Sequence, residues 1–383
     1  MIMSAKQLDT EYQRCLNCLQ APCVNACPLH VSPKEFIALA KKQDYSAAVQ
    51  SIYDKNPLGL ICGHICPHHF CMKACTRCKI DQAVKIPSIQ AALIQQYGKE
   101  FKQPSQIEAN GLKVAVIGSG PAGIGAVWKL LQFGYSVELF EGSDKLGGSL
   151  NLIPEERLPH QVVEYDYQHI LQSDNVILHL NTMIKKPESL IEQGFSGVII
   201  AVGTQEINTL GIEGEEYIVS YVDYLSHPEN YTGAHKIAII GGGKVAADCV
   251  LIAHKQNAKS IQMLIRRNIT DMRMSESERE ELKAYGMDII PLTRVIKVKK
   301  QTKGFSCSLC RTQIIDDKCA DNTALPINEE QYDLVIKAIG GSKIAIQENP
   351  RILCAGDCKN GATTVVEAVS SGIETAEKLD SVI

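Results

Sequence analysis

The most reactive side chains of this sequence are clustered cysteines. Residues 14–28, RCLNCLQAPCVNACP, place four cysteines within thirteen residues and end in Cys-Pro. A second group follows at Cys62, Cys66, Cys71, Cys75 and Cys78. Nine of the fifteen cysteines therefore lie within the first 78 residues. Thiols can form disulfides, and thiolates hold zinc or iron–sulfur clusters. Spacing alone leaves these three possibilities open.

The overall composition indicates how many domains carry these thiols and in which compartment they lie. With 383 residues, 45% of them hydrophobic and 21% charged, the chain is expected to form two or three globular domains. A net charge of −4 shows no strong basic bias, so nothing suggests a nucleic-acid surface, and no apolar run approaches the length of a membrane span. The polar start lacks the apolar core of a signal peptide, so we expect a cytoplasmic protein. Disulfides are disfavoured there, which favours metal or cluster ligation.

The elements around the cysteines are expected to be helices. Residues 33–57 carry apolar side chains at helical spacing until Pro57 and Gly59 interrupt the pattern. The segment IPSIQAALIQQYG predicts another helix that begins near Pro87. Residues 101–111 are polar and contain Pro and Gly, as linkers do.

The pattern changes after this linker. LKVAVIGSGPAGIGAVWKLLQFGYSVELFEG predicts a strand, a glycine turn, a helix and a strand, and HKIAIIGGGKVAADCVLIAHKQNAKSIQMLIRR predicts the same again. Two such units about 120 residues apart predict two doubly wound nucleotide-binding domains.

The first glycine turn predicts an adenine dinucleotide site. Glycines at its key positions let the backbone approach a pyrophosphate, and the helix that follows offers free N–H groups. Glu141 lies 23 residues after the first glycine, where a carboxylate binds ribose hydroxyls and repels a 2′-phosphate. The turn consists of Gly118, Ser119, Gly120, Pro121, Ala122 and Gly123.

Two further motifs indicate that this dinucleotide is FAD. Lys145, Gly147 and Gly148 closely follow the acidic residue, as is typical of FAD-binding domains of the glutathione-reductase type. Such domains also end in a strand followed by Gly-Asp, here Gly356 and Asp357. A helix that begins near Thr363 or Thr364 would direct its positive N-terminus at the flavin.

The second glycine turn predicts a nicotinamide dinucleotide, and basic residues after its second strand indicate NADPH. Guanidinium groups there suit a 2′-phosphate. The strands expected at 197–203 and 332–340 would connect this domain to the FAD domain. The residues are Gly241, Gly242, Gly243, Lys244 and Val245 in the turn, with Arg266, Arg267 and Arg273 after the strand.

A flavin next to the cysteines favours iron–sulfur clusters over zinc. Nicotinamides deliver two electrons as hydride, flavins can release them singly, and clusters carry one each. Nine cysteines exceed the eight or so ligands that two 4Fe–4S clusters require.

At this point the motifs resemble a known family. RCLNCLQAPCVNACP, NPLGLICGHICP, FCMKAC and KIPSIQ resemble the N-terminal part of dihydropyrimidine dehydrogenase and its bacterial NAD(P)H-oxidising subunit, and more loosely the small subunit of glutamate synthase. The resemblance continues through RLP at 157–159, AIG at 338–340 and the AGD motif. It implies that Arg157, Ala338 and Gly340 also contact the cofactors.

The resemblance also implies how two 4Fe–4S clusters are held. Cys62 matches a family cysteine that is not a ligand, and Cys78 is an addition in this chain. Four residues separate Cys66 from Cys71 where dihydropyrimidine dehydrogenase has five. A glutamine as the last ligand favours the pyrimidine branch over glutamate synthase. The implied ligands are Cys15, Cys18, Cys23 and Cys75 for one cluster, and Cys27, Cys66, Cys71 and Gln90 for the other.

Other cysteines fall outside these ligand sets. Cys307, Cys310 and Cys319 lie in a stretch that the family does not use for metal, and we interpret them as strand or surface-loop residues. Cys307 and Cys310 also come too late in the nicotinamide domain to form a thioredoxin-reductase-like disulfide.

These observations predict an α/β fold with two Rossmann-like domains behind a helical cluster domain. The expected segments are a helical iron–sulfur domain at 1–105, FAD-binding parts at 112–205 and 346–383, and an NADPH domain at 206–345. The expected function is transfer of electrons from NADPH through FAD and two clusters to another protein. Cofactor positioning suffices for that chemistry, so no acid–base residue is expected.

The expected acceptor is an FMN-containing dihydropyrimidine dehydrogenase subunit, since 383 residues leave no room for an FMN barrel or amidotransferase domain. The alternatives are a glutamate synthase large subunit and a ferredoxin-like carrier. A zinc-stabilised sensor or scaffold that binds nucleotides without turnover is the rival class.

Overall fold

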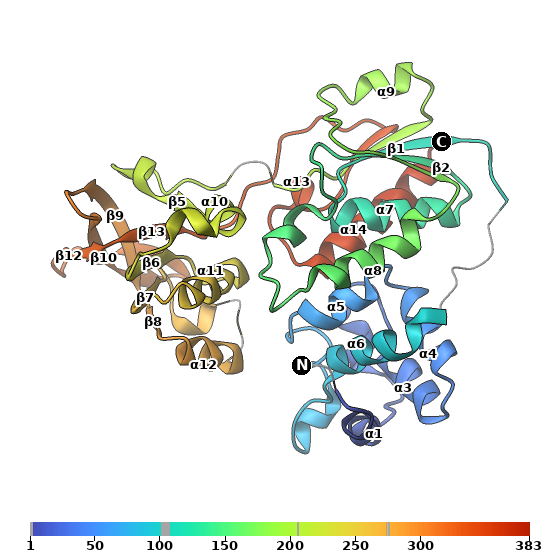
Figure 1. The fold of residues 1–383 in the computed structure, drawn as a ribbon, viewed down its shortest axis with the longest axis horizontal. Coiled ribbons are helices and arrows are strands. Elements are labelled where there is room, and N and C mark those ends of the chain that lie inside the picture. The colour runs from blue at the N-terminus through green and yellow to red at the C-terminus, as the bar shows by residue number, and fades with distance from the viewer. Residues whose placement is uncertain (1–2, 101–107, 205–206, 273, 275) are drawn as a thin grey trace. The chain divides into compact units, whose positions relative to one another are not determined.

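The chain forms two compact units. The computed structural model describes residues 3–100, 108–204, 207–272, 274 and 276–383 (Figure 1). Unit 1 spans Met1–Leu150, Glu155–Gln205 and Ser342–Ile383, and unit 2 spans Asn151–Pro154 and Glu206–Gly341. Among the helices described, none has both the length and the apolar character needed to cross a membrane.

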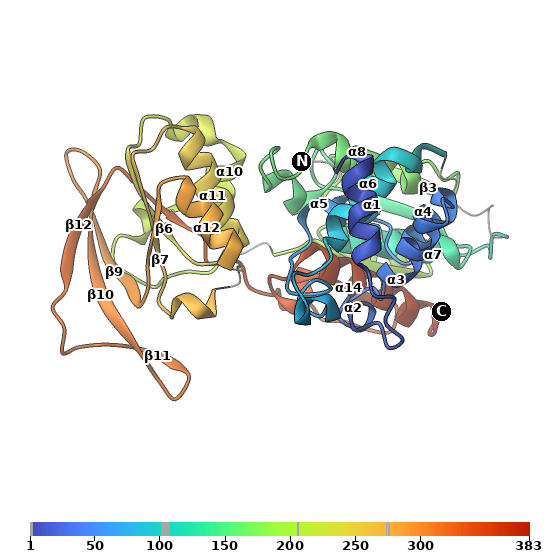
Figure 2. The ribbon, with the colours of Figure 1, turned by 90° about the horizontal axis from the view of Figure 1, so that it is seen from below.

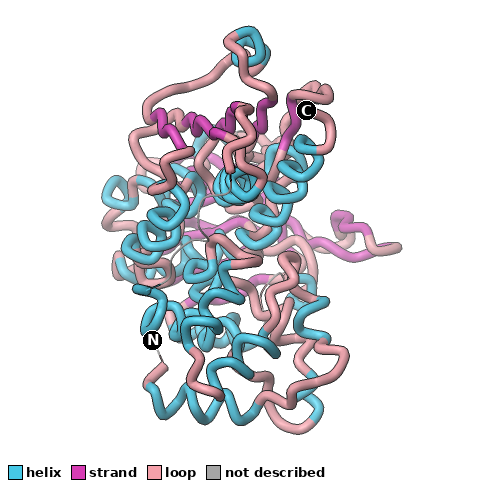
Figure 3. Tube along the Cα trace, turned by 90° about the vertical axis from the view of Figure 1, so that its right-hand side faces the viewer, coloured by secondary structure: helices cyan, strands magenta, loops and turns pink. Residues whose placement is uncertain are grey.

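The N-terminal part of unit 1 consists of helices and loops, and its described residues up to 100 contain no strand (Figure 3). Short polar side chains begin several of these helices: Ser4, Ser32 and Asp44 each accept a hydrogen bond from a backbone N–H of the first turn. The helices are α1 (Ala5–Arg14), α2 (Pro22–Asn25), α3 (Pro33–Lys41), α4 (Tyr45–Tyr53), α5 (Gly59–Ile65) and α6 (Ile86–Tyr97).

The segment with continuous helical spacing forms two helices, α3 and α4, rather than one. Gln43 adopts a left-handed conformation (φ 63°), and Asp44 then caps α4. The break leaves Phe36 and Ile52 both fully buried. The helix expected near Pro87 is confirmed as α6.

The rest of unit 1 is a parallel sheet in the order β14-β4-β1-β2-β3, with α7, α8 and α14 drawn on one side of it and α9 on the other (Figure 1). The predicted strand–turn–helix–strand pattern is confirmed by β1, α7 and β2. The elements are β1 (Lys113–Ile117), α7 (Pro121–Gln132), β2 (Ser136–Phe140), α8 (His160–Leu171), β3 (Val176–His179), α9 (Glu188–Glu192), β4 (Gly197–Ile200), β14 (Ile352–Cys354), α13 (Asp357–Asn360) and α14 (Val365–Asp380).

Helices α7 and α14 pack closely because glycines face the contact. A Cβ at Gly372 would lie 2.0 Å from the carbonyl oxygen of Ala122, and a Cβ at Gly125 would lie 2.6 Å from that of Val369. Any side chain there would push the helices apart. This contact fixes the two helices that follow the predicted flavin-binding motifs.

A buried carboxylate joins the cluster part of unit 1 to its sheet part. Asp166 of α8 is fully buried and accepts hydrogen bonds from the Tyr53 hydroxyl (2.8 Å) and from the backbone N–H groups of Leu60 (3.3 Å) and Ile61 (2.8 Å). Helix α5 has no N-cap side chain of its own, so Asp166 supplies the acceptor for its first turn. The carboxylate therefore positions the helix that leads to Cys66.

We expect the stability of the protein to fall as pH rises because of Asp166. Burial raises its pKa from 3.8 to about 7, although the bonds from Ile61, Tyr53 and Leu60 oppose this. The unfolded chain releases this proton near pH 3.8, whereas the folded chain keeps it to about pH 7. The cost accumulates as pH rises through that window, to on the order of 4 kcal/mol. Thermal unfolding from pH 5 to 8 should show a declining midpoint, and Asp166→Asn should flatten the decline. An equal slope in the variant would contradict this account.

Unit 2 has three layers (Figure 2). A parallel sheet, β5-β13-β6-β7-β8, carries α10, α11 and α12 on one face and an antiparallel sheet of β9 to β12 on the other. Here too the predicted strand–turn–helix–strand pattern is confirmed. The elements are β5 (Val219–Ser220), α10 (Tyr221–Ser226), β6 (Lys236–Ile240), α11 (Lys244–Lys255), β7 (Ser260–Leu264), α12 (Glu276–Ala284), β8 (Met287–Ile290), β9 (Thr293–Lys300), β10 (Phe305–Ile315), β11 (Lys318–Asp321), β12 (Asn328–Tyr332) and β13 (Leu334–Lys337).

Candidate functional site

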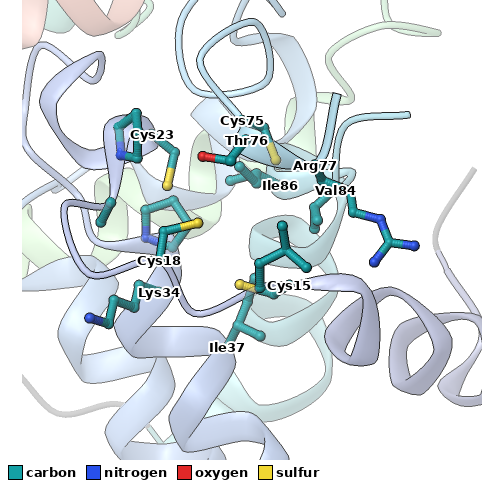
Figure 4. Close-up of a pocket in the computed structure, with 14 residues that line it drawn as sticks. Cys15, Cys18, Cys23, Lys34, Ile37, Cys75, Thr76, Arg77, Val84 and Ile86 are labelled. Carbon is teal, nitrogen blue, oxygen red and sulfur yellow. The ribbon is translucent and has the colours of Figure 1, made fainter. Parts of the chain in front are cut away.

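Four cysteines from two distant segments surround one cavity of the helical part. Two come from the segment between α1 and α2, the third lies in α2 itself, and the fourth precedes the short helix Thr76–Lys79. Their sulfur atoms point toward a common space, with Ile37, Val84 and Ile86 at its walls (Figure 4). We call this space the first cysteine cavity, lined by Cys15, Cys18, Cys23 and Cys75.

Charged side chains hold these two segments together. Arg14, directly before Cys15, bonds to Glu11 (2.9 Å) and to Asp81 (3.1 Å). Arg77 also binds Asp81, at 2.7 Å, and donates to the carbonyl oxygen of Arg14. Arg77 and then Arg14 hold the pKa of Asp81 well below its usual range. The motifs in the sequence do not reveal this clamp, which joins residues 67 positions apart.

A second cavity gathers the other predicted ligands, and we call it the second cysteine cavity. Cys66 ends α5, and a Cβ at Gly63 would lie only 2.8 Å from Ala91, so α5 approaches α6 closely enough to bring Gln90 beside it. The amide nitrogen of Gln90 donates to the carbonyl oxygen of Gly59 (2.6 Å). The lining includes Cys27, Cys62, Cys66, Cys71 and Gln90.

The two cavities are neighbours. Cys23, in α2, lines the first cavity, and Cys27, two residues after α2 ends, lines the second. Burial, with smaller contributions from the nearby thiols of Cys27 and Cys23, raises the pKa of the Cys71 thiol to about 12. A thiol of the second cavity therefore lies close to one of the first.

The donor sets fit iron–sulfur clusters. Burial raises the pKa of Cys23 to about 11, with contributions from Cys75 and Cys15, so the Cys23 thiol needs a nearby cation to become a thiolate at neutral pH. Among the described residues, no three His, Cys, Asp or Glu side chains converge as a single metal ion would require. Sulfur atoms placed around a cavity suit a group of several metal atoms.

The first glycine turn has the shape that a bound pyrophosphate needs. Gly118 has a φ of 101° and Gly123 faces its carbonyl oxygen, where a Cβ would lie 1.9 Å away. Gly120 differs, because its φ of −67° suits any residue and a Cβ there would meet nothing within 4 Å. The chain's own packing does not require a glycine at 120, whereas close approach of a ligand to the backbone does. Pro121 and Ala122 open α7 behind it.

Glu141 follows β2 and is engaged by the chain itself. One carboxylate oxygen accepts bonds from the Ser119 backbone N–H (3.0 Å) and hydroxyl (2.6 Å). The other accepts from the Ser143 N–H (2.9 Å) and hydroxyl (3.1 Å). Burial raises the pKa of Glu141, but these bonds lower it more, so the carboxylate stays charged. Ribose hydroxyls would share or replace the serine hydroxyls.

The other predicted flavin residues of unit 1 lie around this turn or near α14. Gly148 is adjacent to Gly120, since its Cβ would lie 3.3 Å from the Gly120 Cα, and Gly147 donates to the Ser119 hydroxyl. Lys145 is exposed, and Arg157 is partly buried.

The Gly-Asp motif begins α13 and is hydrogen-bonded to the segment just before α14. A Cβ at Gly356 would lie 2.5 Å from the Cβ of Ala122, so the motif packs on α7. Asp357 accepts bonds from the backbone N–H and the hydroxyl of Thr363. Burial raises the pKa of Asp357 despite these bonds. The expected helix is confirmed as α14, which begins at Val365 with Thr364 as its N-cap.

Helix α14 also reaches the second cysteine cavity. Val366, in its first turn, is part of the cavity lining. The Ser370 hydroxyl donates to the carbonyl oxygen of Pro28 (3.1 Å), the residue after Cys27. One helix thus connects the Gly-Asp motif with the cluster part of unit 1.

The second glycine turn, in unit 2, shares the backbone geometry of the first. Gly241 (φ 136°) faces the carbonyl oxygen of Ala338, which a Cβ would approach to 2.2 Å, and a Cβ at Gly242 would press on Ile265. Gly243, like Gly120, has an ordinary φ and opens onto empty space at the start of a helix. Lys244 forms an ion pair with Glu278, and Gly340 follows β13 with a φ of 73°. Val245, in the first turn of α11, is partly buried and packs against the hydrophobic core of unit 2.

The predicted 2′-phosphate residues follow β7. Arg266 and Arg267 are exposed there, while Arg273 lies outside the described residues. The backbone carbonyl of Arg266 accepts bonds from the Thr312 hydroxyl (2.8 Å) and the Cys319 thiol (3.0 Å). The antiparallel sheet therefore braces this turn.

The remaining cysteines have structural surroundings. Cys307 and Cys310 lie on β10, where both are buried, and Cys319 lies on β11. Cys78 is exposed and near the carbonyl oxygen of Met72.

Comparison with known proteins identifies the family. A family model described as pyridine nucleotide-disulphide oxidoreductase matches residues 112–372, and one described as dihydropyrimidine dehydrogenase domain II, 4Fe-4S cluster, matches residues 1–101. The chain belongs to the pyridine nucleotide-disulphide oxidoreductase family and carries a 4Fe–4S domain of the dihydropyrimidine dehydrogenase type. It is an NAD(P)H-dependent oxidoreductase, and the expected fold class and resemblance are confirmed.

Curated relatives and solved structures agree with this assignment. The NAD-dependent dihydropyrimidine dehydrogenase subunit PreT of Escherichia coli O157:H7 is 29% identical over 96% of this chain and 92% of its own. The NADPH-Fe(3+) oxidoreductase subunit beta of Geobacter sulfurreducens is 28% identical over 75% of this chain and 45% of its own. Mycobacterium tuberculosis FprA in complex with NADPH shares the fold, with a TM-score of 0.62 and 17% identity over 70% of this chain and 84% of its own.

Proposed function

We propose that this chain is the NADPH-oxidising, electron-input subunit of a larger oxidoreductase and holds FAD and two 4Fe–4S clusters. The observation that carries the proposal is the lining of the second cysteine cavity, where α14, the helix that follows the Gly-Asp motif and α13, meets the predicted cluster ligands. When bound, a flavin takes two electrons as hydride and releases them singly to clusters.

The chain's own residues would hold and orient these groups. The first cysteine cavity would hold one cluster through Cys15, Cys18, Cys23 and Cys75, and the second would hold the other through Cys27, Cys66, Cys71 and Gln90. Residues 1–105 would form the cluster domain, 112–205 and 346–383 the FAD domain, and 206–345 the nicotinamide domain. The N-termini of α7 and α11 would receive the two pyrophosphates.

The proposed partner is a dihydropyrimidine dehydrogenase catalytic subunit. The support is the PreT relatives, which are named as subunits of that enzyme and match over nearly their whole length. A second candidate is an NADPH:acceptor reductase that delivers electrons to another protein, since a Geobacter relative is named as a subunit of an NADPH-Fe(3+) oxidoreductase.

Anaerobic purification from the native host tests the function as a whole. We expect a brown protein with one flavin, about eight iron atoms and as much sulfide per chain. NADPH should bleach its visible absorbance, and an FMN-containing protein should co-purify. A colourless protein with zinc and no iron would refute the proposal.

We expect Arg266→Ala with Arg267→Ala to raise the Michaelis constant for NADPH by roughly tenfold, the equivalent of about 1.4 kcal/mol. The exposed guanidinium groups directly after β7 stand where a 2′-phosphate would lie. The constant for NADH, which lacks this phosphate, should change little. Steady-state kinetics with both nucleotides measure this directly. Equal effects on the two would refute the preference for NADPH.

A further inference from the structure

The first cysteine cavity is bordered by apolar side chains that face solvent. Leu16 lines the cavity and is 42% exposed, Leu19 follows Cys18 and is 94% exposed, and Ile80 is 65% exposed. A soluble protein gains nothing by exposing three large aliphatic side chains beside one site, and such patches mark interaction surfaces.

Ion pairs and hydrogen bonds hold the loops that carry Leu16 and Ile80. Arg14 and Arg77 share Asp81, which fixes the Cys15 loop to the segment that carries Ile80. The backbone N–H of Ile80 donates to the carbonyl oxygen of Arg77 (2.9 Å). The apolar groups are thus presented in a defined arrangement, which lowers the entropy cost of docking.

Several lysines lie in the same segments as this apolar group. Lys73 and Lys79 precede Ile80 and are exposed, as is Lys85, and Lys34 lines the cavity. The acidic groups Glu11 and Asp81 are already engaged by arginines. Residues 3–100 contain eleven Lys or Arg and seven Asp or Glu, a balance of +4 in a chain whose net charge is −4. The rest of the chain therefore carries −8, and the basic character is local.

The cysteines of the second cysteine cavity are more buried than those of the first. The lining of the second cavity includes Val366 of α14, and two of its four cysteines, Cys62 and Cys71, are buried, whereas the four cysteines of the first cavity are all partly exposed. The first cavity is therefore the more accessible of the two to another protein.

We propose that Leu16, Leu19 and Ile80, with the lysines around them, form the docking surface for an electron-accepting protein with an acidic contact face. This inference rests on the proposed function and adds where the acceptor binds and what charge it carries. Each NADPH would supply two electrons, which leave in two single-electron transfers to the acceptor's own one-electron centre, and the proton is released to solvent. The apolar centre excludes water and the basic rim steers the acceptor.

The test compares two protein acceptors of opposite charge, an acidic ferredoxin and the basic cytochrome c. Ferricyanide, a small oxidant that needs no protein interface, reports whether NADPH oxidation is intact. We expect Leu19→Asp with Lys79→Glu to reduce the rate with ferredoxin at low salt by roughly tenfold or more and to leave the ferricyanide rate and iron content unchanged. Added salt should slow the ferredoxin reaction of the unmodified chain.

Two further variants complete the design. Ile80→Ser with Lys73→Glu changes the same surface without touching the Cys15 loop, in case the first variant loses iron. Ile177→Asp with Lys186→Glu makes equivalent changes on and near the exposed edge strand β3 and should have no effect. Unchanged ferredoxin rates in both surface variants, or a preference of the unmodified chain for cytochrome c, would overturn the docking surface. Absence of NADPH oxidation with ferricyanide in the unmodified chain would instead refute the function on which it rests.

Discussion

Cys66→Ser should separate electron entry from electron exit. In this variant we expect NADPH to reduce ferricyanide at the normal rate, while transfer to a protein acceptor falls by at least about 100-fold, roughly 2.7 kcal/mol of activation free energy. Cys66 ends α5 and lines the second cysteine cavity, beside the first turn of α14. Loss of this thiolate would remove the cluster that we propose to accept electrons from the flavin. Iron should fall from about eight to about four atoms per chain.

Cys62→Ser is the matched control for this experiment. Cys62 lines the same cavity, one turn earlier on the same helix, and is 4% exposed. Burial raises the pKa of its thiol to about 12, as burial also does for Cys71, so only the resemblance marks Cys62 as a non-ligand. This variant should keep its iron and its transfer rate. If Cys62→Ser lost iron while Cys66→Ser kept it, the proposed ligand set would be wrong.

The glycine turns, strands and main helices were predictable because their determinants are local. Gly118 needs a positive φ, and Thr364 with Glu367 forms a capping box within one turn, so sequence spacing alone indicates both. The break between α3 and α4 was not predictable. It depends on Gln43, a residue with no special preference for a left-handed conformation, whose strain the packing of Phe36 and Ile52 offsets.

The assignment of the cysteines to two ligand sets did not follow from the sequence pattern alone. Spacing left zinc, disulfides and clusters open, and only the resemblance implied that Cys75 belongs with Cys15 rather than with its neighbour Cys71. The structure places these thiols around two separate cavities through contacts between distant segments, such as Arg14 with Asp81. The support that Asp166 gives to α5, from 105 residues away, could not be read from any motif either.

Gly120→Val should abolish flavin binding without unfolding the chain. The φ of Gly120 suits any residue, and a Cβ there meets no protein atom within 4 Å, so the apo protein should fold normally. The added methyl groups would fill the space through which a pyrophosphate reaches the N-terminus of α7. We expect flavin affinity to fall by at least about 100-fold, or roughly 2.7 kcal/mol. Flavin fluorescence after gel filtration, with circular dichroism of the same sample, measures both properties.

Three other glycine variants show whether this effect belongs to the ligand. Gly142→Ala, close to Glu141, would make only ordinary contacts with Met183 and should bind flavin normally. Gly123→Ala should instead unfold the turn, because its Cβ would lie 1.9 Å from a carbonyl oxygen. Gly243→Val should lose NADPH binding and keep the flavin, since Gly243 opens onto empty space in the second turn. A Gly120→Val protein that retained its flavin would show that the open space beside α7 is not where the dinucleotide lies.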